Sequence, residues 1–173
     1  MALLFVPVLT GKSQKHLNCA VGGLTSLALF INMLIIKTRM KKVRAMPHLT
    51  IEYSANLDAA GDIAGLCRVL HAAILDSGLF ELGAVRVRAL RCMDYAIADL
   101  LDLNAFADLR LRIGAGRSSA DMARAGEAVF AAACAHFAPL FEAPHFALTL
   151  DVAQNDPVLS WKKNAIHPRL RAK

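Results

Sequence analysis

Apolar and polar side chains alternate along four stretches in the second part of this sequence. Residues 48–53 (HLTIEY) are apolar at every second position, and residues 85–91 (VRVRALR), 108–113 (DLRLRI) and 146–152 (FALTLDV) repeat the alternation. Successive side chains of a strand point to opposite faces of a sheet, so this period of two indicates strands with one buried face. The sequence therefore predicts four strands.

Helical periodicity fills the two long gaps between these strands. The first helix is predicted over residues 62–78, where Asp62 is placed to cap the first turn and Gly78 to end the helix. The second is predicted from about Ser119 to Phe141, after a capping box that Ser118 opens. Each helix therefore connects one predicted strand to the next.

The order strand, helix, strand occurs twice, which predicts an α+β fold made of tandem β-α-β units. Each unit is satisfied by a parallel pair of strands joined by a crossover helix. Both units can share one four-stranded sheet with two helices on one face. The other face would carry the strand arginines, which suggests ion pairing or subunit contact there: Arg86, Arg88, Arg110 and Arg112.

The first 46 residues differ in composition from the rest. Residues 17–36 carry no charge, and about 20 apolar residues suffice to cross a bilayer. One interpretation is a membrane anchor with the basic cluster after it on the cytoplasmic side. The favoured interpretation is a start-site artefact, in which translation begins at Met46 and the methionine is removed before Pro47. We therefore predict an extension over residues 1–46 and one folded domain over residues 47–173.

Charge and cysteine usage exclude several function classes. Residues 1–46 hold seven of the 20 Lys and Arg residues and none of the 14 Asp and Glu, so the domain itself is close to neutral. The basic balance is therefore no indication of nucleic-acid binding. Neither the four cysteines nor the six histidines have metal-ligand or redox spacing, so we expect no metal and no cofactor, and a reducing cytoplasm fits.

Four motifs in order carry a resemblance to a known family. They are MPHLTIEYS at 46–54, GLFELGAVRVR at 78–88, IGAGRS at 113–118 and WKKNAIH at 161–167. Together they resemble the 5-carboxymethyl-2-hydroxymuconate delta-isomerase family of the tautomerase superfamily, over about residues 47–167.

This resemblance implies an isomerase whose catalytic residues are Pro47, Arg86 and Arg117. It implies that Arg117 and Arg86 also bind substrate, with His48 beside them, and that the protein is a homotrimer without a cofactor. The implied substrate is the dienol 5-carboxymethyl-2-hydroxymuconate, in the homoprotocatechuate pathway of aromatic compound catabolism.

The chemistry of a proton-transferring isomerase agrees with these residue types. A terminal α-amino group titrates near ~7.7–8.0, and burial beside cations lowers that pKa, so a terminal proline can act as a base near neutral pH. This requires that the nitrogen of Pro47 is not in a peptide bond. Arginine grips carboxylates with paired hydrogen bonds, and Arg117 follows a small-residue turn that leads into a helix N-terminus.

Two alternatives remain open. The chain could be a membrane-tethered, catalytically silent tautomerase-like module, in which Pro47 is acylated by Met46. It could instead be a tautomerase that acts on another unsaturated oxo-acid, because residues 91–105 depart from the pattern of the family beside the expected pocket.

Overall fold

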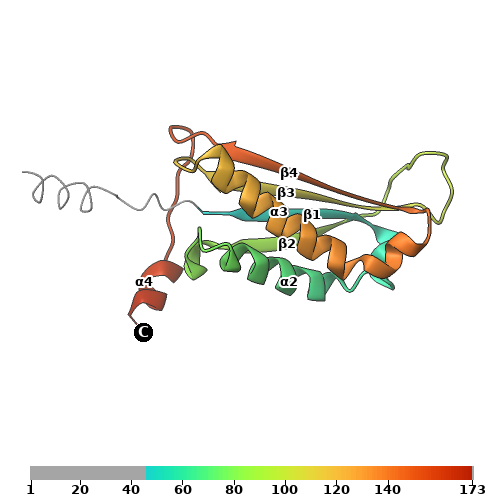
Figure 1. Ribbon diagram of the computed structural model, residues 1–173, viewed down its shortest axis with the longest axis horizontal. Coiled ribbons are helices and arrows are strands. Elements are labelled where there is room, and N and C mark those ends of the chain that lie inside the picture. The colour runs from blue at the N-terminus through green and yellow to red at the C-terminus, as the bar shows by residue number, and fades with distance from the viewer. Residues whose placement is uncertain (1–45, 173) are drawn as a thin grey trace, which may run out of the picture. The chain divides into compact units, whose positions relative to one another are not determined.

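Strands and helices alternate along residues 46–172, the part of the chain that the computed structural model describes (Figure 1). In chain order the elements are β1 (His48–Ser54), the 3-10 helix η1 (Ala55–Asp58), α2 (Ile63–Asp76), the 3-10 helix η2 (Leu82–Ala84), β2 (Arg86–Cys92), β3 (Ala105–Gly114), α3 (Ser119–His136), the 3-10 helix η3 (Ala138–Glu142), β4 (Phe146–Asn155) and α4 (Ile166–Arg171).

The four strands form one mixed sheet in the order β2-β1-β3-β4. β1 runs parallel to β2, β3 runs parallel to β4, and β1 and β3 pair antiparallel in the middle. Each parallel pair is joined through a helix, α2 in the first unit and α3 in the second. The predicted α+β fold of two β-α-β units is therefore confirmed.

Both long helices cover the same face of the sheet (Figure 1). The alternation in the strands explains this, because Leu49 and Ile51 of β1 and Leu109 and Leu111 of β3 all turn to the helices and are fully buried. Burying a Leu or Ile side chain contributes roughly 1.5–3 kcal/mol, so this face supplies most of the core. The opposite face carries the polar positions of the same strands, including His48.

The helix boundaries follow from local chemistry. The Asp62 carboxylate accepts a hydrogen bond from the Gly65 amide (3.0 Å), and Gly78, at φ +68°, follows the end of α2 as predicted. The second helix is shorter than the predicted 119–141, because α3 ends at His136 and a separate 3-10 turn follows. Pro139 explains the difference, since it has no amide hydrogen to donate within a helix.

The C-terminal segment contains a short helix that the sequence pattern did not predict. The Asn164 amide donates to the Gly83 carbonyl oxygen (2.9 Å), and His167 is buried with its Nδ1 3.3 Å from a Glu81 carboxylate oxygen. These contacts dock α4 against η2, so the segment that follows β4 is drawn back across the end of the sheet.

Within residues 46–172, no helix is long and apolar enough to cross a membrane. The predicted anchor over residues 17–36 lies outside the described residues, and so does most of the predicted extension. The choice between an anchor and a start-site artefact therefore stays a prediction.

Candidate active site

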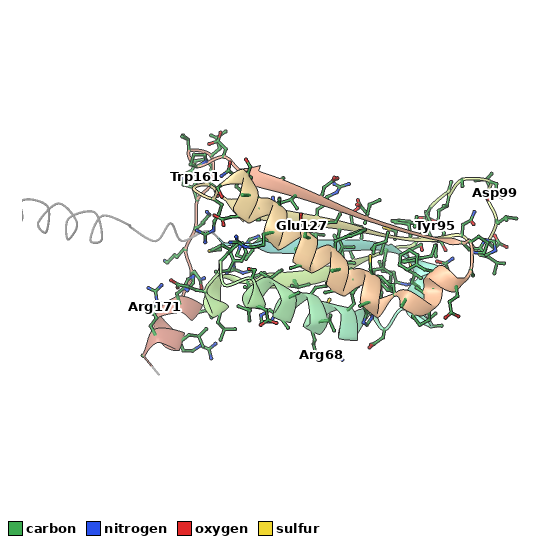
Figure 2. All side chains as sticks on the ribbon, in the orientation of Figure 1. Arg68, Tyr95, Asp99, Glu127, Trp161 and Arg171 are labelled. Atoms are coloured by element: carbon green, nitrogen blue, oxygen red, sulfur yellow. The ribbon has the colours of Figure 1, made fainter. Side chains whose placement is uncertain are left out.

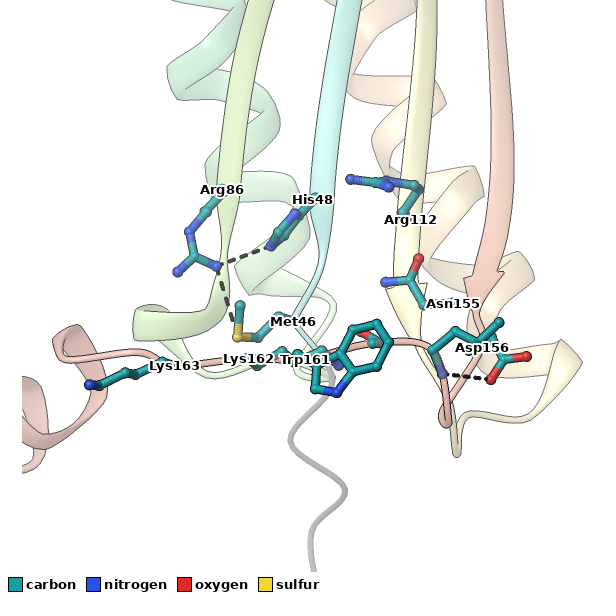
Figure 3. Close-up of a pocket in the computed structure, with 11 residues that line it drawn as sticks. Met46, His48, Arg86, Arg112, Asn155, Asp156, Trp161, Lys162 and Lys163 are labelled. Atoms are coloured by element: carbon teal, nitrogen blue, oxygen red, sulfur yellow. Dashed lines mark hydrogen bonds between the residues drawn. The ribbon is translucent and has the colours of Figure 1, made fainter.

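A cavity of about 370 Å³ opens at the end of the sheet where β1 begins (Figure 3). It is lined by Met46, His48, Arg86, Arg112, Asn155, Asp156, Leu159, Ser160, Trp161, Lys162 and Lys163. Two arginines and two lysines face one acidic residue here, so the cavity favours an anionic ligand. Its floor comes from three adjacent strands, and one wall comes from the segment after β4.

A row of three side chains crosses the floor of the cavity. His48 on β1 is the Cα partner of Arg86 on β2 and of Arg112 on β3. Partners in register project from the same face of a sheet, so both arginines flank the imidazole on the face that the helices leave open. Figure 3 shows the three side chains on neighbouring strands in this order.

Arg86 and His48 are in direct contact, with 3.0 Å between Arg86 Nη1 and His48 Nε2. A guanidinium can only donate, so Nε2 accepts and the ring is neutral, with its hydrogen on Nδ1. Burial lowers the pKa of His48, and the nearby Arg86, Arg112, Arg88 and Lys162 lower it further. The imidazole is thus held as a neutral base inside a cationic site.

Pro47 lies beside this cavity. Its side chain is fully buried, and its carbonyl oxygen accepts a hydrogen bond from the Arg86 amide (3.2 Å). The residues on both sides of it, Met46 and His48, line the cavity. The Met46 sulfur lies 3.9 Å from Arg86 Nη1 and from Asn164 Nδ2, so the methionine occupies the space next to the proline nitrogen.

The wall after β4 begins with a turn that Asp156 holds. One oxygen of its carboxylate accepts from the Val158 amide (2.7 Å) and the Leu159 amide (3.1 Å). These two hydrogen bonds hold a turn, and the chain then runs along the mouth of the cavity toward Lys162. Trp161 on the same segment is 84% exposed, so its indole ring is largely open to solvent.

Arg117 lies at the same end of the sheet but does not line this cavity. It follows the turn after β3, where Gly116 has φ +93°, a conformation that suits glycine. Its Nη2 donates to the Leu79 carbonyl oxygen, and its guanidinium carbon lies 5.3 Å from the centre of the Phe80 ring. The structure thus brings Pro47, His48 and Arg86 together, whereas Arg117 lies on the turn between β3 and α3 and its side chain contacts the segment before η2.

From the sequence, Arg112 was expected to take part in ion pairing or subunit contact, and the lysines of the wall, Lys162 and Lys163, were given no role. Arg112 shares its polar face with His48, but that is visible only once β1 and β3 are known to be neighbours in this register. Lys162 and Lys163 belong to the WKKNAIH motif, so the motif's resemblance to the family could have indicated them as candidate site residues. Among residues 46–172, no three His, Cys, Asp or Glu side chains gather as metal ligands.

Comparisons with known proteins place these features in a family. The family model described as 5-carboxymethyl-2-hydroxymuconate isomerase matches residues 47–170. The 5-carboxymethyl-2-hydroxymuconate Delta-isomerase of Escherichia coli is 33% identical over 122 residues, which are 70% of this chain and 97% of that protein.

Solved structures agree with the sequence comparisons. A 5-carboxymethyl-2-hydroxymuconate isomerase from Deinococcus radiodurans R1 superposes with a TM-score of 0.70 at 39% identity, covering 74% of this chain and 96% of its own. A second 5-carboxymethyl-2-hydroxymuconate delta-isomerase structure has a TM-score of 0.66 at 37% identity, covering 73% and 94%. The chain belongs to the 5-carboxymethyl-2-hydroxymuconate isomerase family of the tautomerase superfamily, and it is an isomerase.

Proposed function

We propose that this isomerase converts the dienol 5-carboxymethyl-2-hydroxymuconate to its 2-oxo-3-ene isomer, in homoprotocatechuate and 4-hydroxyphenylacetate degradation. The relatives that match most of the domain carry this substrate in their names. The substrate has three carboxylates, and the cavity beside Pro47 is strongly cationic. The observation that carries the proposal is the position of Pro47 between two cavity-lining residues and next to Arg86.

In the proposed reaction, the ring nitrogen of Pro47 is the base. Its lone pair takes the proton of the enol hydroxyl, which leaves a dienolate, and the resulting prolinium returns that proton to the carbon at the far end of the diene. The products are a ketone and one remaining carbon–carbon double bond, and the proline is neutral again. Cations near a free amine disfavour its protonated form, which suits an acid–base catalyst near neutral pH.

Arg86 is proposed to stabilise the charge that develops on the dienolate oxygen. It lies at the cavity floor and contacts both His48 and the sulfur of Met46. A fixed cation at a developing oxyanion commonly contributes about a hundred- to a thousandfold in rate. The neutral ring of His48 can donate from Nδ1 to bound substrate, and Arg117 is proposed to bind a substrate carboxylate from the adjoining loop.

The mechanism needs a chain whose first residue is Pro47. Three observations support such a start: the family match begins at Pro47, the acidic residues are absent before it, and Met46 fills the space beside its nitrogen. Removing Met46 would free the proline nitrogen and the two donors that now face the methionine sulfur, Arg86 Nη1 and Asn164 Nδ2. We therefore propose residues 47–173 as the active enzyme, located in the cytoplasm.

The active form is proposed to be a homotrimer. The face of the sheet opposite α2 and α3 carries no helix within the described residues, as Figure 1 shows. The loop between β2 and β3 exposes apolar side chains, among them Met93 (65%) and Leu100 (70%). Figure 2 shows Tyr95 and Asp99 of this loop at the opposite end of the molecule from Trp161. A second copy could cover both surfaces.

Turnover of matched substrates by the purified chain from Pro47 tests the proposed substrate. The ultraviolet absorbance of the dienol should fall with 5-carboxymethyl-2-hydroxymuconate at an efficiency well above that with 2-hydroxymuconate, which lacks the carboxymethyl group. A preference for the smaller dienol would favour the alternative of a tautomerase for another oxo-acid. The intact mass of the native protein separates both from a tethered module, since a mass that includes residues 1–46 contradicts a start at Pro47.

A further inference from the structure

Arg112 stands on the cavity floor without an assigned role. It lines the cavity from β3 and is the Cα partner of His48. In Figure 3 its guanidinium extends from β3 toward His48, on the side away from Arg86. Arg112 is also among the cations that lower the pKa of His48, so its charge is felt at the centre of the site.

No neighbouring acidic side chain in the described range pairs with the guanidinium of Arg112. Arg110, two residues earlier on the same face, is paired with the Asp108 carboxylate at 3.2 Å. The side chain of Arg112 makes no hydrogen bond or ion pair with any residue in the described range 46–172. The acidic residue that lines the same cavity, Asp156, has one carboxylate oxygen engaged by two backbone amides. The cation is therefore available to a bound anion.

The spacing of the two arginines suits a ligand with separated carboxylates. Neighbouring strands lie ~4.8 Å apart, so the Cα atoms of Arg86 and Arg112, one strand apart across His48, are separated by roughly 10 Å. Two long side chains from these positions can each hold one carboxylate of a diacid, and a neutral imidazole lies between them.

We propose that Arg112 is a substrate-binding residue that selects polycarboxylates, forming with Arg86 a two-armed anion clamp across His48. This proposal rests on the proposed function for the identity of the natural ligand. Arg86 stabilises charge at the reacting end of the substrate, and Arg112 binds a carboxylate remote from the transferred proton. Arg112 therefore contributes to binding of the ground state and of the transition state alike.

The test compares binding of a diacid and a monoacid, adipate and hexanoate, to the chain from Pro47 and two variants. Competitive inhibition constants or nuclear magnetic resonance titrations give the affinities without any need for turnover. The Arg112→Gln variant should lose about ten- to a hundredfold in affinity for adipate and less than about twofold for hexanoate. Arg110→Gln, on the same face but paired with Asp108, is the matched control and should keep the preference for adipate.

Three outcomes would contradict the proposed clamp. They are a wild-type chain that binds hexanoate as tightly as adipate, an Arg112→Gln variant that keeps the preference for adipate, and an equal loss of affinity for both acids in this variant. Arg112→Lys, which keeps the charge, should restore part of the preference and guards against a folding defect in the glutamine variant. With the natural substrate, Arg112→Gln should raise KM and leave kcat nearly unchanged. A chain that prefers adipate but has no isomerase activity would contradict the proposed function and not the clamp.

Discussion

At the scale of single residues, burial and nearby cations favour the neutral form of the His48 imidazole. His48 shows this directly, because its Nε2 accepts from Arg86 and its pKa is lowered first by burial and then by Arg86. In the proposed chain that begins at Pro47, the terminal nitrogen would have the same surroundings, because the Pro47 carbonyl oxygen accepts a hydrogen bond from the Arg86 amide. A protonation state suited to base catalysis thus follows from burial and from where the arginines stand on the strands.

We predict that His48 titrates below its ordinary value of about 6.5, and that Arg86→Gln raises its pKa part of the way back. Burial remains in the variant, so the recovery is partial. The pKa is measured by nuclear magnetic resonance titration of the imidazole. Arg110→Gln is the control and should leave the titration unchanged, since Arg110 is paired with Asp108. A His48 pKa above 6.5 in the wild type would contradict this account.

The lowered pKa of His48 also determines the direction in which stability changes with pH. Because the folded pKa of His48 is lowered, the unfolded chain binds more protons between the folded and unfolded values. The contribution of His48 to the free energy of unfolding is therefore complete above about pH 6.5 and is lost as the pH falls toward the folded pKa. Denaturant unfolding of wild type and His48→Gln at a series of pH values measures it, and the difference should shrink on acidification.

At the scale of elements, much of the fold could be predicted from the sequence because local chemistry decides it. Alternation located all four strands, and Asp62 and Gly78 mark the limits of α2 as expected. The end of α3 was missed because the apolar period continues through Pro139, while the missing amide hydrogen stops the helix.

Elements that depend on distant contacts could not be predicted in the same way. The docking of α4 relies on Asn164 and His167 meeting η2 across more than eighty residues of chain, which no local pattern records. The placement of Arg86 and Arg112 on the floor of the cavity likewise depends on β1 lying between β2 and β3. The resemblance to the family directed attention to Pro47 and Arg86, which lie at the cavity, whereas Arg112 became a candidate only through the register of the sheet.

The start of α3 offers a test at this scale. Ser118 Oγ accepts a hydrogen bond from the Asp121 amide (3.1 Å), directly after Arg117. Ser118→Ala should lower the free energy of unfolding by about 1 kcal/mol, because an amide of the first turn loses its partner. Ser119→Ala, at the first residue of α3, is the control and should change stability far less. Denaturant unfolding measures both, and equal effects would show that the cap is not stabilising.

At the scale of the whole molecule, residues 46–172 leave one sheet face without a helix and expose an apolar loop, so the chain is expected to associate. The loop between β2 and β3 exposes Leu100 and Leu103, each 70% accessible, and it lies at the end of the sheet away from the cavity. Exposed apolar groups of this kind usually mark an interface. A homotrimer would let each cavity stand near a neighbouring subunit, as the family resemblance implies.

We predict that the chain from Pro47 runs as a trimer in size-exclusion chromatography with light scattering. Replacing Leu100 and Leu103 with serine should weaken the assembly, because the apolar surface that subunits would bury is reduced. Leu82→Ser is the control, since Leu82 is 54% exposed but lies on η2, away from this loop. A fully active monomer at micromolar concentration would contradict the proposed assembly.

The proposed base, the nitrogen of Pro47, can act only when nothing is joined to it. The most direct measurement compares isomerase activity of two chains whose N-termini are verified by intact mass, one beginning at Pro47 and one at Ala45. We predict that the chain from Ala45 loses at least about a hundredfold in kcat/KM, because an amide nitrogen cannot take a proton and Met46 occupies part of the cavity wall beside it. Equal activity of the two chains would contradict it.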